Sequence, residues 1–409
     1  MTTSEVDAAY VWMWLPDTTD PVVAGRLRSA GGLVRFTYGR SYLERDGAIP
    51  LFLPELPLAT GPQVPLDGMH IAGCIADAGP DAWGQQVILH ARGARDVGPL
   101  TFLLESGSDR TGALDFQVSA ADYAPRVTHA PLDELLDAAD RLDTGESLDP
   151  TLAQALLHGS SLGGARPKVH LDAPDGRKLI AKLSRRSDTY PVVNAEGAAM
   201  DLAGRAGLGV AGCEVFRSGD IDVLLVERFD RTPVPGERRM VVSALTILQL
   251  DEAWGRYATY TGLAEQIRRR FVAPDATLRE LFGRIALNIC VGNIDDHGRN
   301  HAAFWDGRSE ALRLTPAYDI CPQPRSVGEV EQAMAFGPGG ERRSRLEPLV
   351  AAHRHYHLEV GEARGIVDHI VDTVRSEWPD AADRARLTAA DRDRLWGAQI
   401  LNPSIFYAD

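Results

Sequence analysis

Two short segments carry residues whose types and spacing could perform acid–base and metal chemistry. Asp295 and Asn300 lie five positions apart in the run Gly292-Asn-Ile-Asp-Asp-His-Gly-Arg-Asn300, and Asp319 follows nineteen positions later. A carboxylate can take a proton from a hydroxyl group, and carboxylate and amide oxygens are ligands that Mg²⁺ prefers. The pattern predicts a general base at Asp295 and metal ligands at Asn300 and Asp319. If Asp295 and Asp296 only cap a loop, Asn300 and Asp319 are left unexplained.

The elements around these residues are expected to form a helix–loop–strand unit. Apolar residues at helical spacing predict a helix over 281–291, and strands are predicted at 302–305 and 311–314. The Asp-x-x-x-x-Asn spacing is the one that protein-kinase catalytic loops use, where Asp accepts a hydroxyl proton and Asn holds Mg²⁺. His297 in this loop is expected to orient it rather than to titrate.

A glycine-rich turn is predicted at 159–165, between a helix and a strand at 167–172. Backbone amides near Gly163 and Gly164 could surround phosphate groups, because glycine permits close approach. The segment is not a Walker loop, since Lys168 follows a proline and enters a strand instead of a helix. A turn without any ligand is the alternative.

Lysine occurs in one region of the chain only. Of the 43 lysine and arginine residues, just Lys168, Lys178 and Lys182 are lysines, which favours a task such as contacting a phosphate. Lys182 lies in the apolar strand predicted over 178–183, similar to the strand whose lysine contacts ATP phosphates in kinases. Glu196, which opens the next helix, is its expected partner, because a lysine in an apolar strand needs one. A lysine that protects a sheet edge is the alternative.

The strand predicted over 221–227 ends in Glu227-Arg-Phe229-Asp230-Arg, where a segment connecting two lobes would pass. Backbone groups in such a segment could contact a purine. Glu227 and Phe229 are therefore predicted to lie at the nucleotide, and Asp230 is predicted to support them.

Three further motifs are rejected as sites. Gly207-Leu-Gly-Val-Ala-Gly212 fits G-x-G-x-x-G but follows a helix and precedes a strand, which is the reverse of the dinucleotide-binding order. His297 and His301 lack the adjacent glutamate of a zinc protease. The run His-Arg-His-Tyr-His at 353–357 is expected to be a solvated face.

Composition narrows the class of protein. The 409 residues carry a formal net charge of −14, which opposes non-specific binding to DNA by this chain alone. No stretch approaches the roughly 18 apolar residues of a membrane helix, and the start lacks a basic flank before its apolar run, so a cytoplasmic protein without a membrane partner is expected. The four cysteines include no C-x-x-C pair and suggest neither disulfides nor a zinc site.

Strand-like patterns come first along the chain and helix-like patterns dominate beyond about residue 240, which predicts the α+β class. At least two lobes are expected, because single cores stop growing at about 250 to 300 residues. We predict a small α+β module over 1–125, a strand-rich lobe with the glycine-rich loop over 126–235, and a helical lobe over 236–409.

The ordered motifs SSLGGARPK, LIAK, VERFDR, GNIDDHGRN and TPAYDI resemble the HipA family of serine/threonine kinase toxins from bacterial toxin–antitoxin modules. The front segments VWMWLPD and IPLFLPELPL are similar to the amino-terminal subdomain of that family. The resemblance implies a two-lobed protein-kinase-like fold that uses ATP and Mg²⁺ in the cytoplasm. It also implies inhibition by a small helix-turn-helix antitoxin of the HipB type, through which alone the protein would sit on DNA.

Carried over by motif, the resemblance makes Asp295 the catalytic base, Asn300 and Asp319 the magnesium ligands and Lys182 the phosphate contact, as the residues themselves suggest. It further implies self-phosphorylation at Ser161, with the adjacent serine as a rival.

The acceptor implied by the resemblance is a protein, with an aminoacyl-tRNA synthetase as the expected example. Two other functions stay open at this point. One is a nucleotide-binding transcriptional co-regulator with little kinase activity, and the other is a kinase-fold phosphotransferase that acts on a small molecule.

Overall fold

A computed structural model gives the fold and describes residues 7–127, 132–143, 152, 156, 166–185, 188–324 and 330–407. The predicted glycine-rich turn, with Gly163, Gly164, Ser160 and Ser161, lies outside the described residues. The chain forms two compact units. The first consists of Met1–Leu183, Arg228–Val242 and Phe304–Ala311, and the second of Ser184–Glu227, Ser243–Ala303 and Leu312–Asp409.

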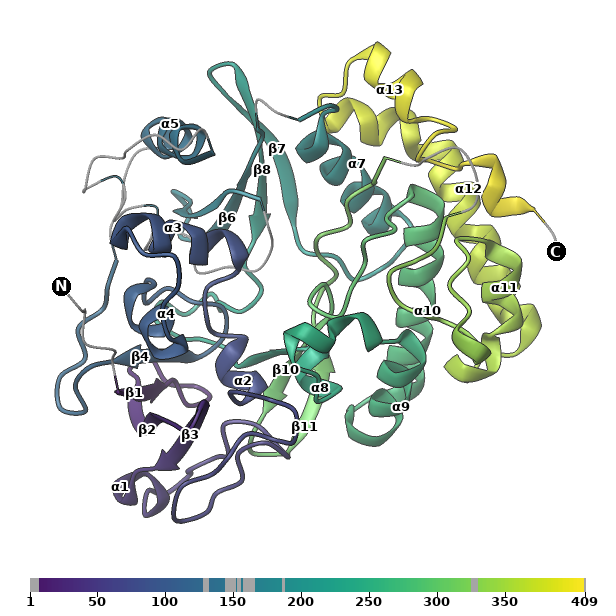
Figure 1. The fold of residues 1–409 in the computed structure, drawn as a ribbon. Coiled ribbons are helices and arrows are strands. Elements are labelled where there is room, and N and C mark those ends of the chain that lie inside the picture. The colour runs from purple at the N-terminus through teal and green to yellow at the C-terminus, as the bar shows by residue number, and fades with distance from the viewer. Residues whose placement is uncertain are drawn as a thin grey trace. The chain divides into compact units, whose positions relative to one another are not determined.

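The first unit mixes strands and helices (Figure 1). The amino-terminal part of this unit contains an antiparallel sheet with the strand order β3-β2-β1-β4. In β3, Val34, Phe36 and Tyr38 alternate with more exposed residues, so one face of the sheet is buried. The elements are β1 (Ala8–Met13), β2 (Val22–Ala30), β3 (Leu33–Tyr38), α1 (Arg40–Leu43), α2 (Gly73–Ala76), α3 (Ala82–Arg92), α4 (Pro99–Glu105), β4 (Leu114–Gln117), α5 (Leu132–Asp143), β5 (Lys168–Asp172) and β6 (Lys178–Leu183).

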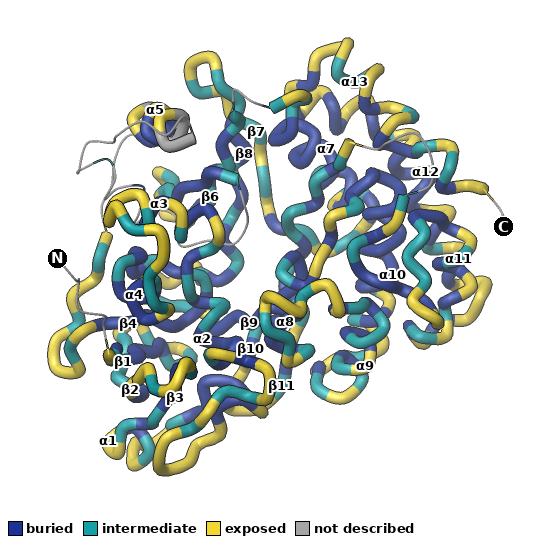
Figure 2. Tube along the Cα trace, in the orientation of Figure 1, coloured by how far each residue is buried: buried dark blue, intermediate teal, exposed yellow. Residues whose placement is uncertain are grey.

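The second unit is mainly helical, and its helix α10 is largely dark blue in Figure 2, as expected for a central core helix. Helix α12 packs against both α7 and α10. The elements are α7 (Val192–Arg205), β7 (Cys213–Ser218), β8 (Ile221–Glu227), α8 (Ala244–Ile247), η1 (Glu252–Tyr257), α9 (Tyr260–Arg270), α10 (Pro274–Val291), η2 (Pro338–Gly340), α11 (Leu346–Ala351), η3 (His353–Tyr356), α12 (Val360–Arg384), α13 (Ala389–Leu395) and η4 (Pro403–Phe406).

Three short strands form a sheet with the order β11-β10-β9, and the boundaries of the two units fall inside these strands. They are β9 (Val241–Ser243), β10 (Ala302–Asp306) and β11 (Ala311–Leu314). The strands predicted at 302–305 and 311–314 are therefore confirmed.

The α+β class is confirmed, and so is the rejection of the G-x-G-x-x-G match. Gly207 has a φ of +80° and follows directly on the end of α7, so the motif is a helix terminus and turn. The predicted boundaries at 125 and 235 do not coincide with the limits of the two units, and the three-part division stays a prediction. Within the described residues, no helix is both long and apolar enough to span a membrane.

Candidate active site

The loop that carries Asp295 begins directly after helix α10. Gly292 caps the end of this helix, and its φ of +71° lies in the left-handed region. A Cβ atom at this position would lie 2.7 Å from the carbonyl oxygen of Gln399, so only glycine fits against the carboxy-terminal segment. The loop then runs to Ala302, where β10 starts, as the sequence predicts.

Asp296 is buried and anchors this loop. Its carboxylate accepts hydrogen bonds from the Tyr260 hydroxyl, from Asn288 Nδ2 at 2.8 Å and from His301 Nε2 at 2.7 Å. Burial and the neighbouring carboxylate raise the pKa of the Tyr260 hydroxyl well above its usual value, so this group stays a donor. Asp296 therefore has the structural role, and His301 is one of its hydrogen-bond partners.

Asp295, in contrast, is exposed, and its carboxylate has no hydrogen-bond partner among the residues that the structure describes. Desolvation by the surrounding protein raises the pKa of this carboxyl, His297 lowers it, and the carboxylates of Asp319 and Asp296 raise it, with a net upward shift. The loop thus separates two adjacent carboxylates, one buried and bonded, the other presented for contact with another molecule.

Asn300 and Asp319 are brought together as the sequence predicts. Asn300 Nδ2 donates a hydrogen bond to Asp319 Oδ2 at 2.8 Å. Asn300 is buried, yet its Oδ1 atom has no hydrogen-bond partner within the described parts of the chain. A buried acceptor of this kind is costly unless a ligand satisfies it.

This arrangement fits Mg²⁺, which is commonly bound through one or two protein oxygens together with water and substrate phosphates. Asn300 Oδ1 and the carboxylate of Asp319 are the oxygens that would hold the ion. The described residues contain no group of three or more His, Cys, Asp or Glu side chains arranged to hold a metal, so any metal here would depend on the nucleotide for further ligands.

The segment that carries Asp319 is tied to the loop by a second contact. The Tyr318 hydroxyl donates to the carbonyl oxygen of Arg299 at 2.7 Å. Asp319 itself has a φ of +61°, a conformation that residues other than glycine rarely adopt and that is enriched at functional sites. No pattern in the sequence indicated Tyr318, although it directly precedes the predicted ligand, or Tyr260 and Asn288, which both donate to Asp296.

Lys182 and Lys168, predicted to contact phosphates, lie opposite each other in the β5–β6 hairpin of the first unit. Lys168 is buried, and its Nζ atom lies 3.3 Å from Asp81 Oδ2. The other oxygen of Asp81 accepts from the Gly84 backbone at the start of α3. The structure thus gives Lys168 an ion pair within the first unit, and the phosphate role of half-buried Lys182 stays a prediction.

The remaining predicted residues are divided between the units. Glu196 is buried in α7 of the second unit, and its pairing with Lys182 stays a prediction. Glu227 is half-buried at the end of β8, and its backbone N–H donates a hydrogen bond to the Gly212 carbonyl oxygen at 2.7 Å. Phe229 packs edge-on against Phe304 with ring centroids 5.8 Å apart. No contact with a nucleotide follows from these positions, so those assignments also stay predictions.

Asp230 is the centre of a buried ion network in the first unit. Its carboxylate accepts from Arg228 Nη2 and Arg231 Nη1, both at 2.8 Å, and from the Gly112 backbone N–H at 2.8 Å. Asp109 pairs with the same two arginines. Although burial alone would raise it, the two guanidinium groups hold the pKa of Asp230 below its usual value. Asp230 therefore joins the 228–231 segment to the amino-terminal module.

We expect Asp230→Ala to lower the free energy of unfolding by about 3–5 kcal/mol, because it leaves buried arginines without one of their carboxylate partners. The matched control is Asp372→Ala, which breaks an exposed Asp–Arg pair with Arg375 and should cost less than about 0.5 kcal/mol. The midpoints of urea unfolding measure both. Equal effects of the two substitutions would contradict the structural role of Asp230.

Comparison with known proteins defines the class first and then the family. A chain of the solved complex of HipA, HipB and operator DNA from Shewanella oneidensis superposes with a TM-score of 0.68 at 19% identity over 95% of both chains. This similarity establishes the α+β, kinase-like fold. The family model of the HipA-like C-terminal domain matches residues 160–378, and that of the HipA N-terminal domain matches residues 14–117. The chain belongs to the HipA family.

Two curated relatives are similar over much of the chain. The Sinorhizobium fredii protein Y4mE, which carries the name of a candidate kinase, is 27% identical over 315 residues, or 71% of this chain and 72% of that protein. The serine/threonine-protein kinase toxin HipA of Shewanella oneidensis is 24% identical over 294 residues, or 63% of this chain and 65% of that protein. The names of these relatives support a kinase-like enzyme.

Proposed function

We propose that this protein is an ATP- and Mg²⁺-dependent serine/threonine protein kinase that acts as the toxin of a toxin–antitoxin module. One observation carries the proposal: the buried Asn300 amide oxygen lacks a partner in the described part of the chain, beside the carboxylate of Asp319 and on the loop of Asp295. Family membership adds support. A capping role for the loop accounts for Asp296 and leaves this arrangement unexplained.

In the proposed reaction, each residue of the loop has a separate task. Asn300 Oδ1 and Asp319 would hold Mg²⁺, which would neutralise charge on the phosphate groups of ATP. Asp295 orients the acceptor hydroxyl and takes its proton on a carboxylate oxygen as phosphoryl transfer proceeds. Asp296 anchors the loop that carries Asp295, and Tyr318 joins that loop to the segment that carries Asp319. Because phosphoryl transfer asks mostly for positioning, such supporting contacts matter for the rate.

The proposed acceptor is a protein of translation such as an aminoacyl-tRNA synthetase, and the proposed location is the cytoplasm. The proposed inhibitor is a helix-turn-helix partner of the HipB type, supported by the HipA–HipB–operator DNA complex to which this chain is similar. A net charge of −14 makes DNA binding dependent on that partner. A co-regulator without transfer and a small-molecule phosphotransferase are the competing functions.

Incubation with labelled ATP and a bacterial extract tests the proposal. Label should reach a protein only when Mg²⁺ is present, and the Asp295→Ala variant should form at least about a hundredfold less labelled product than the parent in the same time. Label that appears only in small molecules would favour the phosphotransferase, and no transfer at all would favour the co-regulator.

Self-phosphorylation is expected at Ser161, which adjoins the glycine-rich segment. A phosphate there would repel the phosphates of ATP, because it adds nearly two negative charges. Mass spectrometry of peptides after incubation with ATP locates the site, and Ser161→Ala should remove the signal. A phosphate found at Ser160, or at neither serine, would contradict this assignment.

Expression of the chain alone is expected to arrest bacterial growth, and co-expression of the helix-turn-helix partner should restore it. The growth rate with Asp295→Ala is the control, since this variant should not arrest growth. Equal growth with the parent and the variant would remove the toxin assignment. Binding of the pair to operator DNA should weaken steeply with salt, because counterions are released from the DNA.

A further inference from the structure

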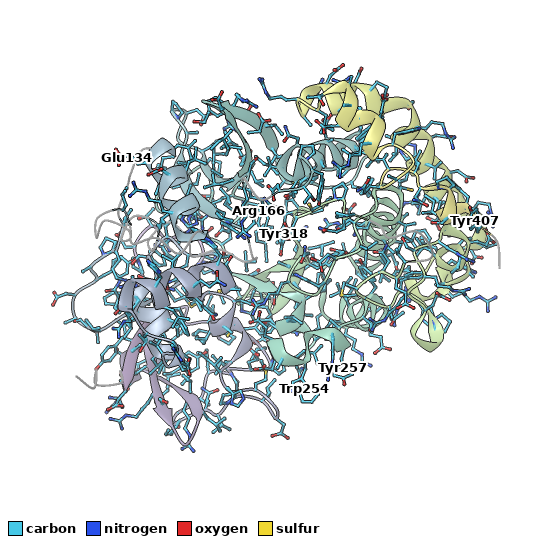
Figure 3. The ribbon with its side chains drawn as sticks, turned by 45° about the horizontal axis from the view of Figure 1, so that its top comes forward. Glu134, Arg166, Trp254, Tyr257, Tyr318 and Tyr407 are labelled. Atoms are coloured by element: carbon cyan, nitrogen blue, oxygen red, sulfur yellow. The ribbon has the colours of Figure 1, made fainter. Side chains whose placement is uncertain are left out.

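The short 3₁₀ helix η1 (Glu252–Tyr257) carries an exposed cluster of two aromatic rings and one guanidinium group. Trp254 and Tyr257 expose 48% and 56% of their surface. Their rings stack with centroids 5.6 Å apart, and the guanidinium of Arg256 lies 5.9 Å from the centre of the first ring and 5.0 Å from that of the second. Both labelled rings lie at the rim of the second unit in Figure 3. We call these three residues the η1 cluster.

Two arginines at the η1 cluster have no acidic partner in the part of the chain that the structure describes. Arg256 donates to the Tyr257 hydroxyl at 3.2 Å, and Arg342 donates to the carbonyl oxygens of Ala333 at 2.9 Å and Arg256 at 3.4 Å. Within the described residues, neither guanidinium has a carboxylate at ion-pair distance. Both guanidinium groups are thus available to a carboxylate of another protein. Charge complementarity therefore favours an acidic partner.

The η1 cluster is joined to the loop that carries the proposed catalytic base. Glu252, the first residue of η1, accepts from Arg299 Nη2 at 2.9 Å. A Cβ atom on Gly298 would lie 3.4 Å from Ala258, which directly follows Tyr257. Gly298 and Arg299 both lie between Asp295 and Asn300 in the chain, so the cluster is positioned next to the same loop.

We propose that the η1 cluster, with Arg342, is the surface on which the acceptor protein docks, and that it binds an acidic segment of that protein. Trp, Tyr and Arg are the residues most enriched at the energetic centres of protein interfaces. A guanidinium group binds carboxylates through paired hydrogen bonds. The inference rests on the proposed kinase function, because it names the acceptor's recognition chemistry.

Nucleic acid is the competing occupant, because aromatic rings and arginine also stack on bases. Two features disfavour it. A nucleic acid would bring a continuous phosphate backbone past Asp251 and Glu252, which lie in or beside η1, and up to a chain with a net charge of −14. A peptide can instead place single carboxylates at the arginines and keep the rest of its chain uncharged there.

Calorimetry with a synthetic serine peptide flanked by glutamates, and with the same peptide flanked by glutamines, tests the docking surface in the absence of ATP. The parent chain should bind the glutamate peptide more tightly. Arg256→Glu should lower that affinity by about tenfold or more and remove the preference. Arg342→Gln should act in the same direction with a smaller effect.

Exposed aromatic residues provide the matched control. Tyr257→Ala should weaken binding of the glutamate peptide, whereas Tyr407→Ala should not, although both side chains expose 56% of their surface. The two tyrosines lie well apart in the second unit (Figure 3). Equal affinities of the two peptides for the parent, or an unchanged preference in Arg256→Glu, would overturn the proposal. Tight binding of a single-stranded oligoribonucleotide that Arg256→Glu abolishes would overturn it in favour of nucleic acid.

Failure of docking and failure of the kinase function are distinguishable. Binding of the glutamate peptide that depends on Arg256 supports the docking surface whether or not phosphate is transferred. Transfer from labelled ATP to both peptides at equal rates would instead support the kinase and overturn the docking surface. Asp295→Ala should bind the glutamate peptide like the parent while transferring phosphate to it at least about a hundredfold more slowly.

Discussion

Asp295→Ala should lower the rate of phosphate transfer by about a hundredfold to ten-thousandfold, the range that a positioned general base contributes. Its affinity for Mg²⁺-ATP should stay close to that of the parent, because the base acts on the acceptor hydroxyl and does not hold the nucleotide. Single-turnover transfer from labelled ATP measures the rate, and calorimetry measures the affinity. A variant that transfers phosphate at the parent's rate would remove Asp295 from the mechanism.

The neighbouring residue supplies the control for this prediction. Asp296→Ala should lower the free energy of unfolding by more than about 2 kcal/mol, because the buried donors of Tyr260, Asn288 and His301 lose their acceptor. Asp295→Asn, which keeps the size of an exposed side chain, should leave the stability unchanged and still lose transfer. The two adjacent carboxylates are thus separable, one by stability and the other by rate.

The sequence predicted the elements around the site well, since their patterns are local. The loop after α10 and the strands β10 and β11 follow from apolar spacing that ends at glycine and polar residues. Helix α10 was predicted to start at 281, yet it begins at Pro274. A proline at the first helical position is a usable signal for that start, and it was not applied.

The Asp-x-x-x-x-Asn spacing selects Asp295 as the base, but the sequence could not show that Asp296 is buried and anchors the loop, because its partners are distant in the chain. Tyr260 and Asn288 belong to α9 and α10, and no local pattern shows that they converge on one carboxylate. The spacing of Asn300 and Asp319 predicted a shared task, and their contact at 2.8 Å agrees with it.

The clustering of the three lysines predicts phosphate contacts, but the structure shows that one of them, Lys168, forms an ion pair within the protein. Lys168 meets Asp81, a residue far away in the sequence that also starts α3. The sequence likewise could not show the partners of Asp230, which include the backbone N–H of the distant Gly112. Charged residues with long-range partners resemble ligand-binding residues when only the sequence is known, because the residue that pairs with them lies far away along the chain.

Removal of the Asp319 carboxylate should abolish the dependence of ATP binding on Mg²⁺. Interactions with a charged group contribute about 1.5–3 kcal/mol, which corresponds to roughly 10- to 100-fold in affinity. Calorimetric titration with ATP, with and without Mg²⁺, measures the loss. Binding of ATP without the metal should be the same in the parent and in the variant.

The backbone conformation of Asp319 dictates which substitutions make the test decisive. Its φ of +61° strains alanine but suits glycine, so Asp319→Ala combines loss of the carboxylate with backbone strain, whereas Asp319→Gly removes the carboxylate alone. Both variants should lose the Mg²⁺-dependent affinity to a similar degree. If Asp319→Gly binds Mg²⁺-ATP like the parent while Asp319→Ala does not, the residue shapes the backbone and is not the metal ligand, and the unpartnered oxygen of Asn300 then requires another explanation.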